Sequence, residues 1–375
     1  MSESKPPFIP VCEPTLGETE RRYVADAMET GWISSAGAYL DRFEKDFAPK
    51  VGAHYGVATC NGTTALHLAL KALGVGPGDE VILPSFTMIA SANAVLYCGA
   101  TPVFVDATSD TWTLNVEQLE QARTSRTKAL MTVTIYGHPS DFDAVKSFCN
   151  QHQIAWLEDA AEGHGAEYKK TPLAALPDAT AYSFFANKII STGEGGMVCT
   201  NRSEIADQLR FLKNLAFPLK GPRNYVHTAV GFNYRMTNLQ AALGCAQTER
   251  MHELVEMRRT NAHYYSQQLS ASGLEELLQL PVEKPWAKNC YWMYGVVLKR
   301  DVKKSRDEIM ITLKEKGVDT RPFFFPMHLQ PILKSGQSLP VSENLGQRGF
   351  YLPSSSHLKR DQMDRVVESL KQVLR

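Results

Sequence analysis

Two side chains in the segment 157–197 are of types that together can activate a carbonyl compound: the carboxylate of Asp159 and the amine of Lys188. Asp159 follows the apolar run Ile154-Ala-Trp-Leu157, which predicts a buried strand that delivers a carboxylate at its tip. Lys188 ends the motif Ser183-Phe-Phe-Ala-Asn-Lys188, and a glycine-rich stretch, Thr192-Gly-Glu-Gly-Gly-Met197, follows it. A carboxylate can hold a protonated pyridine nitrogen, and a lysine amine can form an imine with an aldehyde. The pair therefore predicts a site for pyridoxal phosphate.

The chemistry of that cofactor requires both residue types. The ring withdraws electrons only while its nitrogen stays protonated, and a buried Asp keeps it so. A lysine holds the aldehyde and then carries protons between substrate and cofactor carbons. Each residue alone also has an ordinary explanation, because a strand-end Asp often caps a helix or pairs with a cation, and most lysines are solvated. Their combination with the neighbouring motifs favours the cofactor site.

A phosphate cradle is predicted where a strand turns into a helix, at Cys60-Asn-Gly-Thr-Thr-Ala-Leu66. The N–H groups near Gly62 and Thr63 should point outward there, and the helix dipole favours an anion at that end. The alternative is that Asn61 only caps a structural helix.

The composition is that of a soluble globular protein, with 375 residues, 43% hydrophobic and 21% charged. This length allows one large and one smaller domain. Forty basic and forty acidic residues cancel, so no charge excess indicates binding to nucleic acid or to an anionic membrane. Seven scattered cysteines without a Cys-x-x-Cys pair indicate reduced thiols and a cytoplasmic location. We expect neither an export signal nor a membrane span.

Strand-like and helix-like patterns alternate along most of the chain, which predicts an α/β fold with a mostly parallel sheet. The expected strands span 55–59, 80–83, 102–105, 129–135 and 154–157, and the expected helices span 18–30, 63–73, 88–97 and a stretch from 141. A long helical stretch at 237–269 should link a large domain, 1–250, to a smaller one, 251–375. The smaller domain should contain a segment at 290–298, a helix at 305–316 and a final helix from 361.

Other glycine and metal motifs are excluded. Gly193-Glu-Gly-Gly-Met-Val198 has Val where a dinucleotide-binding motif needs its third Gly. His252-Glu253 is followed by Glu256 where a zinc protease needs its second His, so we expect no metal and place His252 on a helix surface.

Four motifs together resemble those of the sugar-nucleotide aminotransferases, the DegT/DnrJ/EryC1/StrS family of fold-type I pyridoxal-phosphate enzymes. They are Glu158-Asp-Ala-Ala-Glu-Gly-His-Gly165, Ser183-Phe-Phe-Ala-Asn-Lys188, Thr192-Gly-Glu-Gly-Gly-Met197 and Gly231-Phe-Asn-Tyr-Arg-Met236. The resemblance extends from Gly31-Trp-Ile-Ser-Ser35 to Leu352-Pro-Ser354. It implies a large domain with a seven-stranded, mostly parallel sheet and a smaller carboxy-terminal α+β domain.

The resemblance also implies roles for individual residues. Lys188 is the catalytic residue that bonds to the cofactor, and Asp159 contacts the ring nitrogen. Gly62, Thr63 and Ser183 match the phosphate ligands. Glu162 matches a position near the phenolic oxygen, although a structural salt bridge is an alternative. Asn233 matches a residue that reaches the cofactor phosphate of the neighbouring subunit, which implies a homodimer with shared sites; a monomer with Asn233 in a turn is the alternative.

One position departs from the family pattern. The family usually places an aromatic residue after Thr87 to stack on the cofactor, and this chain has Met88. A thioether can also pack on a ring, contributing about 0.3–1.5 kcal/mol. The alternative is that Met88 fills the core.

Substrate contacts are implied for two segments. Trp32, Ser34 and Ser35 match a segment near the site entrance, and Arg321 and His328 match the small domain's part of the substrate pocket. The Arg321 guanidinium suits a carboxylate or a phosphate. The aromatic residues at 323–325 lie between Arg321 and His328, and the alternative to a place in the substrate pocket is that they form part of the domain core.

The resemblance implies a transamination in which L-glutamate leaves its amino group on the cofactor as pyridoxamine phosphate. The amine then passes to the keto group of a nucleotide-linked 4-keto-6-deoxysugar. Family members that dehydrate the sugar carry His at the lysine position, so Lys188 favours transamination. We expect amination at C4 of a guanosine-linked sugar, and a thymidine- or uridine-linked sugar and amination at C3 are the alternatives. A non-catalytic regulator is a further alternative, but this chain lacks the basic patch that would mark one.

Overall fold

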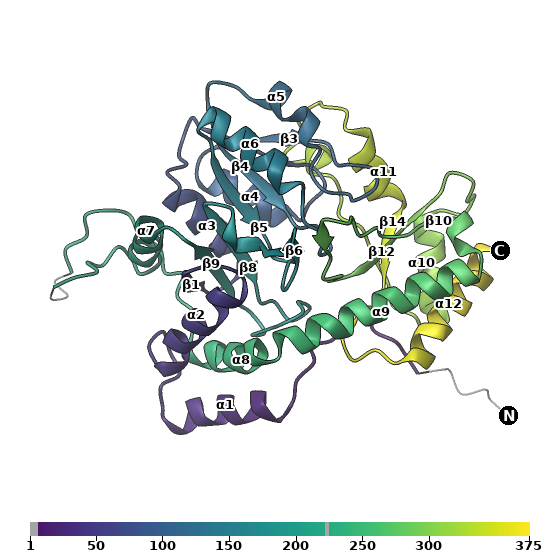
Figure 1. Cartoon of the computed structure of the whole chain (residues 1–375), viewed down its shortest axis with the longest axis horizontal. Helices are drawn as coiled ribbons and strands as arrows, with labels where there is room; N and C mark the ends of the chain where they lie inside the picture. The colour runs from purple at the N-terminus through teal and green to yellow at the C-terminus, as the bar shows by residue number, and fades with distance from the viewer. Residues whose placement is uncertain (1–6, 222–224) are drawn as a thin grey trace.

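A seven-stranded sheet forms the centre of the protein, which a computed structural model describes for residues 7–221 and 225–375 (Figure 1). The strand order is β1-β9-β8-β5-β4-β2-β3. The bounds are Tyr55–Thr59 for β1, Glu80–Pro84 for β2, Thr101–Val105 for β3, Thr127–Val133 for β4, Ala155–Asp159 for β5, Ala179–Ser183 for β8 and Gly196–Thr200 for β9. Strands β3, β2, β4, β5 and β8 pair in parallel, and β9 runs antiparallel to both of its neighbours. The expected α/β fold with a mostly parallel sheet is confirmed.

Helices cover both faces of this sheet, because successive side chains of each strand point to opposite faces. Ile82 and Leu130 belong to one core cluster, and Val81 and Met131 belong to the other. The first cluster includes residues of α2 (Ala38–Lys50), α6 (Phe142–His152) and α8 (Asn238–Glu249). The second includes residues of α3 (Gly62–Ala72), α4 (Ile89–Tyr97) and α7 (Ser203–Lys213). Helix α1 (Glu18–Glu29) packs on α8, and the short α5 (Leu119–Ala122) follows β3.

The carboxy-terminal part has its own core around a four-stranded sheet, in the order β10-β12-β14-β13. Its strands are β10 (Leu278–Gln279), β12 (Tyr294–Leu298), β13 (Arg321–Pro322) and β14 (Gly349–Leu352). Its helices are α9 (Met251–Ala271), α10 (Arg306–Glu315), α11 (Pro340–Arg348) and α12 (Arg360–Leu374). A three-stranded sheet of β6 (Glu167–Tyr168), β7 (Thr171–Pro172) and β11 (Ala287–Lys288) joins this part to the region after β5. Figure 1 shows α9 running from the large sheet to the carboxy-terminal helices.

The expected helical stretch at 237–269 is helical except at Arg250, where two helices, α8 and α9, meet. Arg250 leaves helical geometry, with φ −98° and ψ 3°, while its guanidinium binds Glu20 and Glu253. This break coincides with the division into 1–250 and 251–375, which stays a proposal. His252 lies exposed on α9, as expected. Within 7–221 and 225–375, no helix combines the length and the apolar character needed to cross a membrane.

Candidate functional site

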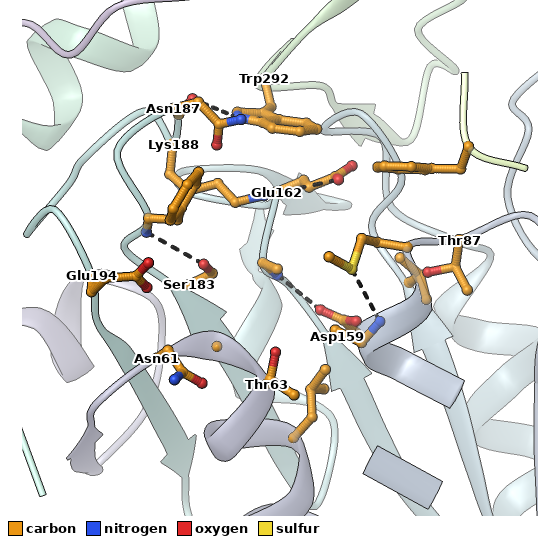
Figure 2. A pocket seen from close by; sticks show the side chains of 18 of the residues that line it. Asn61, Thr63, Thr87, Asp159, Glu162, Ser183, Asn187, Lys188, Glu194 and Trp292 are labelled. Carbon is orange, nitrogen blue, oxygen red and sulfur yellow. Dashed lines mark hydrogen bonds and ion pairs between the residues drawn. The ribbon is translucent and has the colours of Figure 1, made fainter. Parts of the chain in front are cut away.

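A cavity of about 450 Å³ lies at the carboxyl ends of β5 and β8, and Figure 2 shows it from close by. The amino-terminal ends of α3 and α4 form one part of its wall. Residues of the carboxy-terminal part close it from the other side: Trp292, Phe324 and Tyr351. Parallel strands bring their carboxyl ends to one edge, which is where ligands of open α/β sheets bind. Seven of the predicted site residues line this cavity: Gly62, Thr63, Met88, Asp159, Glu162, Ser183 and Lys188. The helix-cap residue Asn61 lines it as well.

Asp159 is the last residue of β5, and its side chain is held by two donors. The Ser91 hydroxyl donates to Oδ2 at 2.7 Å, and the Ala161 N–H donates to Oδ1 at 3.1 Å. Burial raises the pKa of Asp159, while these two hydrogen bonds and the charge of Lys188 act in the opposite direction. The carboxylate is therefore fixed in orientation inside the cavity, and a cationic N–H donor there would offset its desolvation.

Lys188 lies in the turn between β8 and β9, and its amine points into the cavity (Figure 2). Its side chain is 10% exposed, and Nζ lies 3.9 Å from Glu162 Oε1. Burial lowers the pKa of Lys188, and the charges of Glu162 and Asp159 oppose that shift. A buried amine of this kind loses its proton more readily than a surface lysine, as a nucleophile must.

Glu162 is buried between Lys188 and the backbone of Tyr136. Its Oε2 accepts a hydrogen bond from the Tyr136 N–H at 2.7 Å. Burial raises the pKa of Glu162 to about 7, and the charge of Lys188 opposes this. The ion pair with Lys188 is present, and the side chain also lines the cavity, so the two expected roles of Glu162 are compatible.

The start of α3 has the properties of an anion cradle. Asn61 caps the helix, because its Oδ1 accepts the Thr64 N–H at 2.9 Å. Within the described chain, the N–H groups of Gly62 and Thr63 have no recorded hydrogen-bond partner. A Cβ on Gly62 would lie 2.7 Å from the Cβ of Ser183, so only glycine lets the helix start approach the end of β8. Two free N–H groups beside a hydroxyl can bind a phosphate.

Met88 lines the cavity at the amino-terminal end of α4, and it is 47% exposed. Its Sδ accepts the Ala90 N–H at 3.0 Å. The alternative that Met88 fills the core is therefore wrong, and a contact of its thioether with a cofactor ring stays a prediction.

Three predicted substrate residues lie away from the cavity, in the loop between α1 and α2. Trp32, Ser34 and Ser35 are exposed. The Trp32 carbonyl accepts from Asn238 Nδ2 at 2.6 Å, and the Ser34 carbonyl accepts from the Asn238 N–H at 2.5 Å. Asn233 is also exposed and pairs with Asn214 through a β-bridge. Their contacts to substrate and to a partner's phosphate stay predictions.

Arg321 and His328 also lie outside the cavity lining. Arg321 is half exposed and forms an ion pair with Asp319 at 2.5 Å. His328 is fully buried, with Nδ1 2.7 Å from the Ser85 hydroxyl and Nε2 3.2 Å from Glu343 Oε1. These contacts hold His328 in the interior, and a contact of Arg321 or His328 with the substrate stays a prediction. Of the neighbouring aromatics, Phe323 is core, as the alternative interpretation held, whereas Phe324 lines the cavity.

Sequence reasoning missed several residues that shape the site. Ser91 holds Asp159, and Trp292 covers Lys188 with its ring centroid 3.8 Å from Nζ. His164 is buried, and neither of its ring nitrogens has a hydrogen-bond partner among the residues that the structure describes. Burial lowers the pKa of His164 to about 3, and the charge of Lys188 acts in the same direction. The Glu158–Gly165 motif contained His164, but no local pattern marked Ser91 or Trp292.

The cavity fits pyridoxal phosphate at three points. Asp159 suits a pyridinium nitrogen, Lys188 suits an aldehyde carbon, and the N–H groups of Gly62 and Thr63 suit a phosphate. A bound ligand of this kind would give hydrogen-bond partners to the N–H groups of Gly62 and Thr63 and a cationic partner to the buried carboxylate of Asp159.

Comparisons with known proteins agree with this geometry. The profile described as the DegT/DnrJ/EryC1/StrS aminotransferase family matches residues 14–371. A Caulobacter vibrioides protein named GDP-perosamine synthase is 43% identical over 98% of this chain and 99% of its own length. An Escherichia coli O157:H7 protein of the same name is 39% identical, covering 97% of this chain and 98% of its own. The structure of Spr1654 from Streptococcus pneumoniae in its PLP form has a TM-score of 0.90 at 25% identity, with 98% of each chain covered.

Proposed function

The chain belongs to the DegT/DnrJ/EryC1/StrS aminotransferase family, whose members use pyridoxal phosphate, and we propose that its substrate is a GDP-linked sugar. The proposed reaction transfers the amino group of L-glutamate to the 4-keto group of GDP-4-keto-6-deoxymannose and gives GDP-perosamine. Such a product would serve the assembly of surface polysaccharides such as O-antigen. The near-full-length identity to two proteins named GDP-perosamine synthase supports this substrate.

The observation that carries the proposal is the placement of Asp159 and Lys188 in one cavity with a free helix amino terminus. Bound pyridoxal phosphate supplies an electron sink for the substrate carbon to which it is joined. Asp159 keeps a proton on the ring nitrogen, because its buried carboxylate is stabilised by a cationic N–H partner. Gly62, Thr63 and Ser183 bind the phosphate.

Lys188 moves the protons in both halves of the reaction. Its Nζ takes a proton from the donor carbon and returns one in the second half, so it must be neutral at one moment and protonated at another. Burial lowers its pKa, and Glu162 at 3.9 Å limits that shift, which keeps both forms accessible.

We also propose that the protein is a cytoplasmic homodimer. Asn233 is exposed and does not line the cavity of its own chain, which supports a role in the site of a neighbouring subunit. All seven cysteines are free thiols, which supports a reducing compartment.

The substrate proposal is tested by incubating the enzyme with L-glutamate and, in parallel, with GDP-, dTDP- and UDP-linked 4-keto-6-deoxysugars. The aminated products are identified by mass spectrometry and NMR. We expect turnover of the GDP sugar and amination at C4. Turnover of a dTDP or UDP sugar with none of the GDP sugar would refute the nucleotide assignment, and amination at C3 would refute the regiochemistry.

A further inference from the structure

The indole of Trp292 covers the amine of Lys188 (Figure 2). Nζ lies 3.8 Å from the centroid of the ring, and Trp292 is 3% exposed. Trp292 precedes β12 and belongs to the carboxy-terminal part, whereas Lys188 follows β8 of the central sheet. The contact therefore joins the two parts of the chain at the reactive amine.

A second contact fixes the peptide next to that amine. The Trp292 indole N–H donates to the Asn187 carbonyl at 2.8 Å, and the Cys12 thiol donates to the same oxygen at 3.3 Å. Because Asn187 directly precedes Lys188, these bonds restrict the backbone from which the lysine side chain extends.

Trp292 is itself held firmly. Arg258, which is 3% exposed, donates to the Trp292 carbonyl at 3.0 Å and to the Ser356 hydroxyl at 2.9 Å. The ring of Tyr136 stacks on Trp292, with an interplanar angle of 15° and centroids 6.2 Å apart. The hydrogen bond to its backbone and the stacking on its ring together hold the indole of Trp292 in one orientation next to Lys188.

The face of an indole carries negative electrostatic potential and attracts an ammonium ion, most strongly where water is excluded. Lys188 lies in such a place, where burial works against its charge. We propose that Trp292 is a positioning residue that holds Lys188 as an ammonium ion against its indole face whenever the amine is not bonded to the cofactor. The inference rests on the proposed function, since it assigns a place to the lysine that the reaction releases.

Other groups act on the same amine and must be compared with Trp292. The carboxylates of Glu162 and Asp159 favour its charged form, and Cys12, Cys290 and His164 also interact with it electrostatically. Glu162 lies 3.9 Å from Nζ, so both Trp292 and Glu162 bracket the ammonium group. A test must therefore change Trp292 while leaving these charges in place.

The experiment uses the full chain freed of cofactor. The rate at which Lys188 is modified by reductive methylation is followed against pH by peptide mass spectrometry, in the wild type, Trp292→Phe and Trp292→Leu. We expect the apparent pKa of Lys188 to fall by about one unit in Trp292→Leu, because the cation–π attraction is lost, and to fall less in Trp292→Phe, which keeps a ring. The control is Phe324→Leu, which removes another aromatic that lines the cavity.

Equal pKa values of Lys188 in the wild type and Trp292→Leu, or an equal fall in Phe324→Leu, would overturn the proposal. If Trp292→Leu does not fold, Trp292→Phe against the control still decides it. With substrates, kcat should fall in the Trp292 variants, whereas KM for the nucleotide sugar should not change. The methylation result needs no sugar, so a wrong substrate assignment would leave it intact and would appear only in the turnover assays.

Discussion

The hydroxyl of Ser91 donates a 2.7 Å hydrogen bond to the carboxylate of Asp159. Ser91 lies in the first turns of α4, and Asp159 ends β5, so this bond joins a helix to the strand that delivers the carboxylate. Ser91 also contacts the Thr87 hydroxyl at 3.0 Å. The orientation of Asp159 toward the cavity thus depends on a residue that does not itself line the cavity.

Replacement of Ser91 by Ala should weaken the binding of pyridoxal phosphate by roughly tenfold or more, since a hydrogen bond to a charged group contributes about 1.5–3 kcal/mol. The loss raises the pKa of Asp159 further, because that bond favours the ionised form. Fluorescence titration of the cofactor-free protein measures the affinity. Ser140→Ala is the control, because the Ser140 hydroxyl is equally buried but has no hydrogen-bond partner within the described chain. Equal affinities in both variants would contradict the role of Ser91.

Glu158 adjoins Asp159 in β5 and points to the opposite face of the sheet. It is fully buried, and the hydroxyls of Thr132 and Thr134 donate to its carboxyl group. Burial raises the pKa of Glu158 from 4.5 to about 8, against the effect of those hydrogen bonds. The folded protein therefore holds this proton at neutral pH.

The folded state binds this proton more tightly than the unfolded state does. The contribution of Glu158 to the free energy of unfolding is therefore fully present below pH 4.5 and is lost as the pH rises toward about 8. The free energy of unfolding of the wild type should fall across that window by a few kcal/mol relative to Glu158→Gln, which stays neutral. Urea denaturation at several pH values measures it. Glu29→Gln on the surface of α1 is the control and should follow the wild type. If the free energy of unfolding depends on pH in the same way in the wild type and in Glu158→Gln, the prediction that Glu158 is protonated in the folded protein is refuted.

Borohydride reduction of the holoenzyme should fix the cofactor on Lys188, because this amine lies in the cavity beside Asp159 and the free helix end. Peptide mapping identifies the labelled residue, and a label on another lysine would reject the assignment. Lys188→Ala should abolish turnover and keep the fold, as judged by circular dichroism. Lys213→Ala is a matched control, since Lys213 is mostly buried but pairs with Glu44 at 2.8 Å outside the cavity.

Much of the fold could be predicted from the sequence, and so could the residues expected to hold the two polar ends of the cofactor, because both depend on local patterns. Strand β1 and the start of α3 follow from apolar periodicity and a capping residue, and Asp159 follows from its place after an apolar run. Trp292 and Ser91 could not be found this way, since their contacts join residues distant in sequence. The break at Arg250 was missed for the same reason, because Glu20 of α1 takes part in it.

Helix α2 illustrates a different limit. Leu40, Phe43 and Phe47 recur at helical spacing, but Pro49 stands in its last turn, and we did not expect a helix there from the sequence. Both phenylalanines are fully buried and pack against Phe184, one residue after Ser183. Tertiary packing of this apolar face therefore stabilises the helix, as it does for most helices in proteins.

Mixing two inactive variants should restore part of the activity if the protein is a homodimer that shares its sites. Lys188→Ala removes the reactive amine, and Asn233→Ala removes the group that we expect to reach the partner's phosphate. In a mixed dimer, one site then receives an intact Lys188 from one subunit and an intact Asn233 from the other, while the second site lacks both. We expect specific activity per mixed dimer of about half the wild-type value, because one of two equivalent sites is complete. Co-expression with two different tags isolates the mixed dimer, and mixing Lys188→Ala with itself under two tags gives the control. No recovery in isolated mixed dimers would refute site sharing through Asn233.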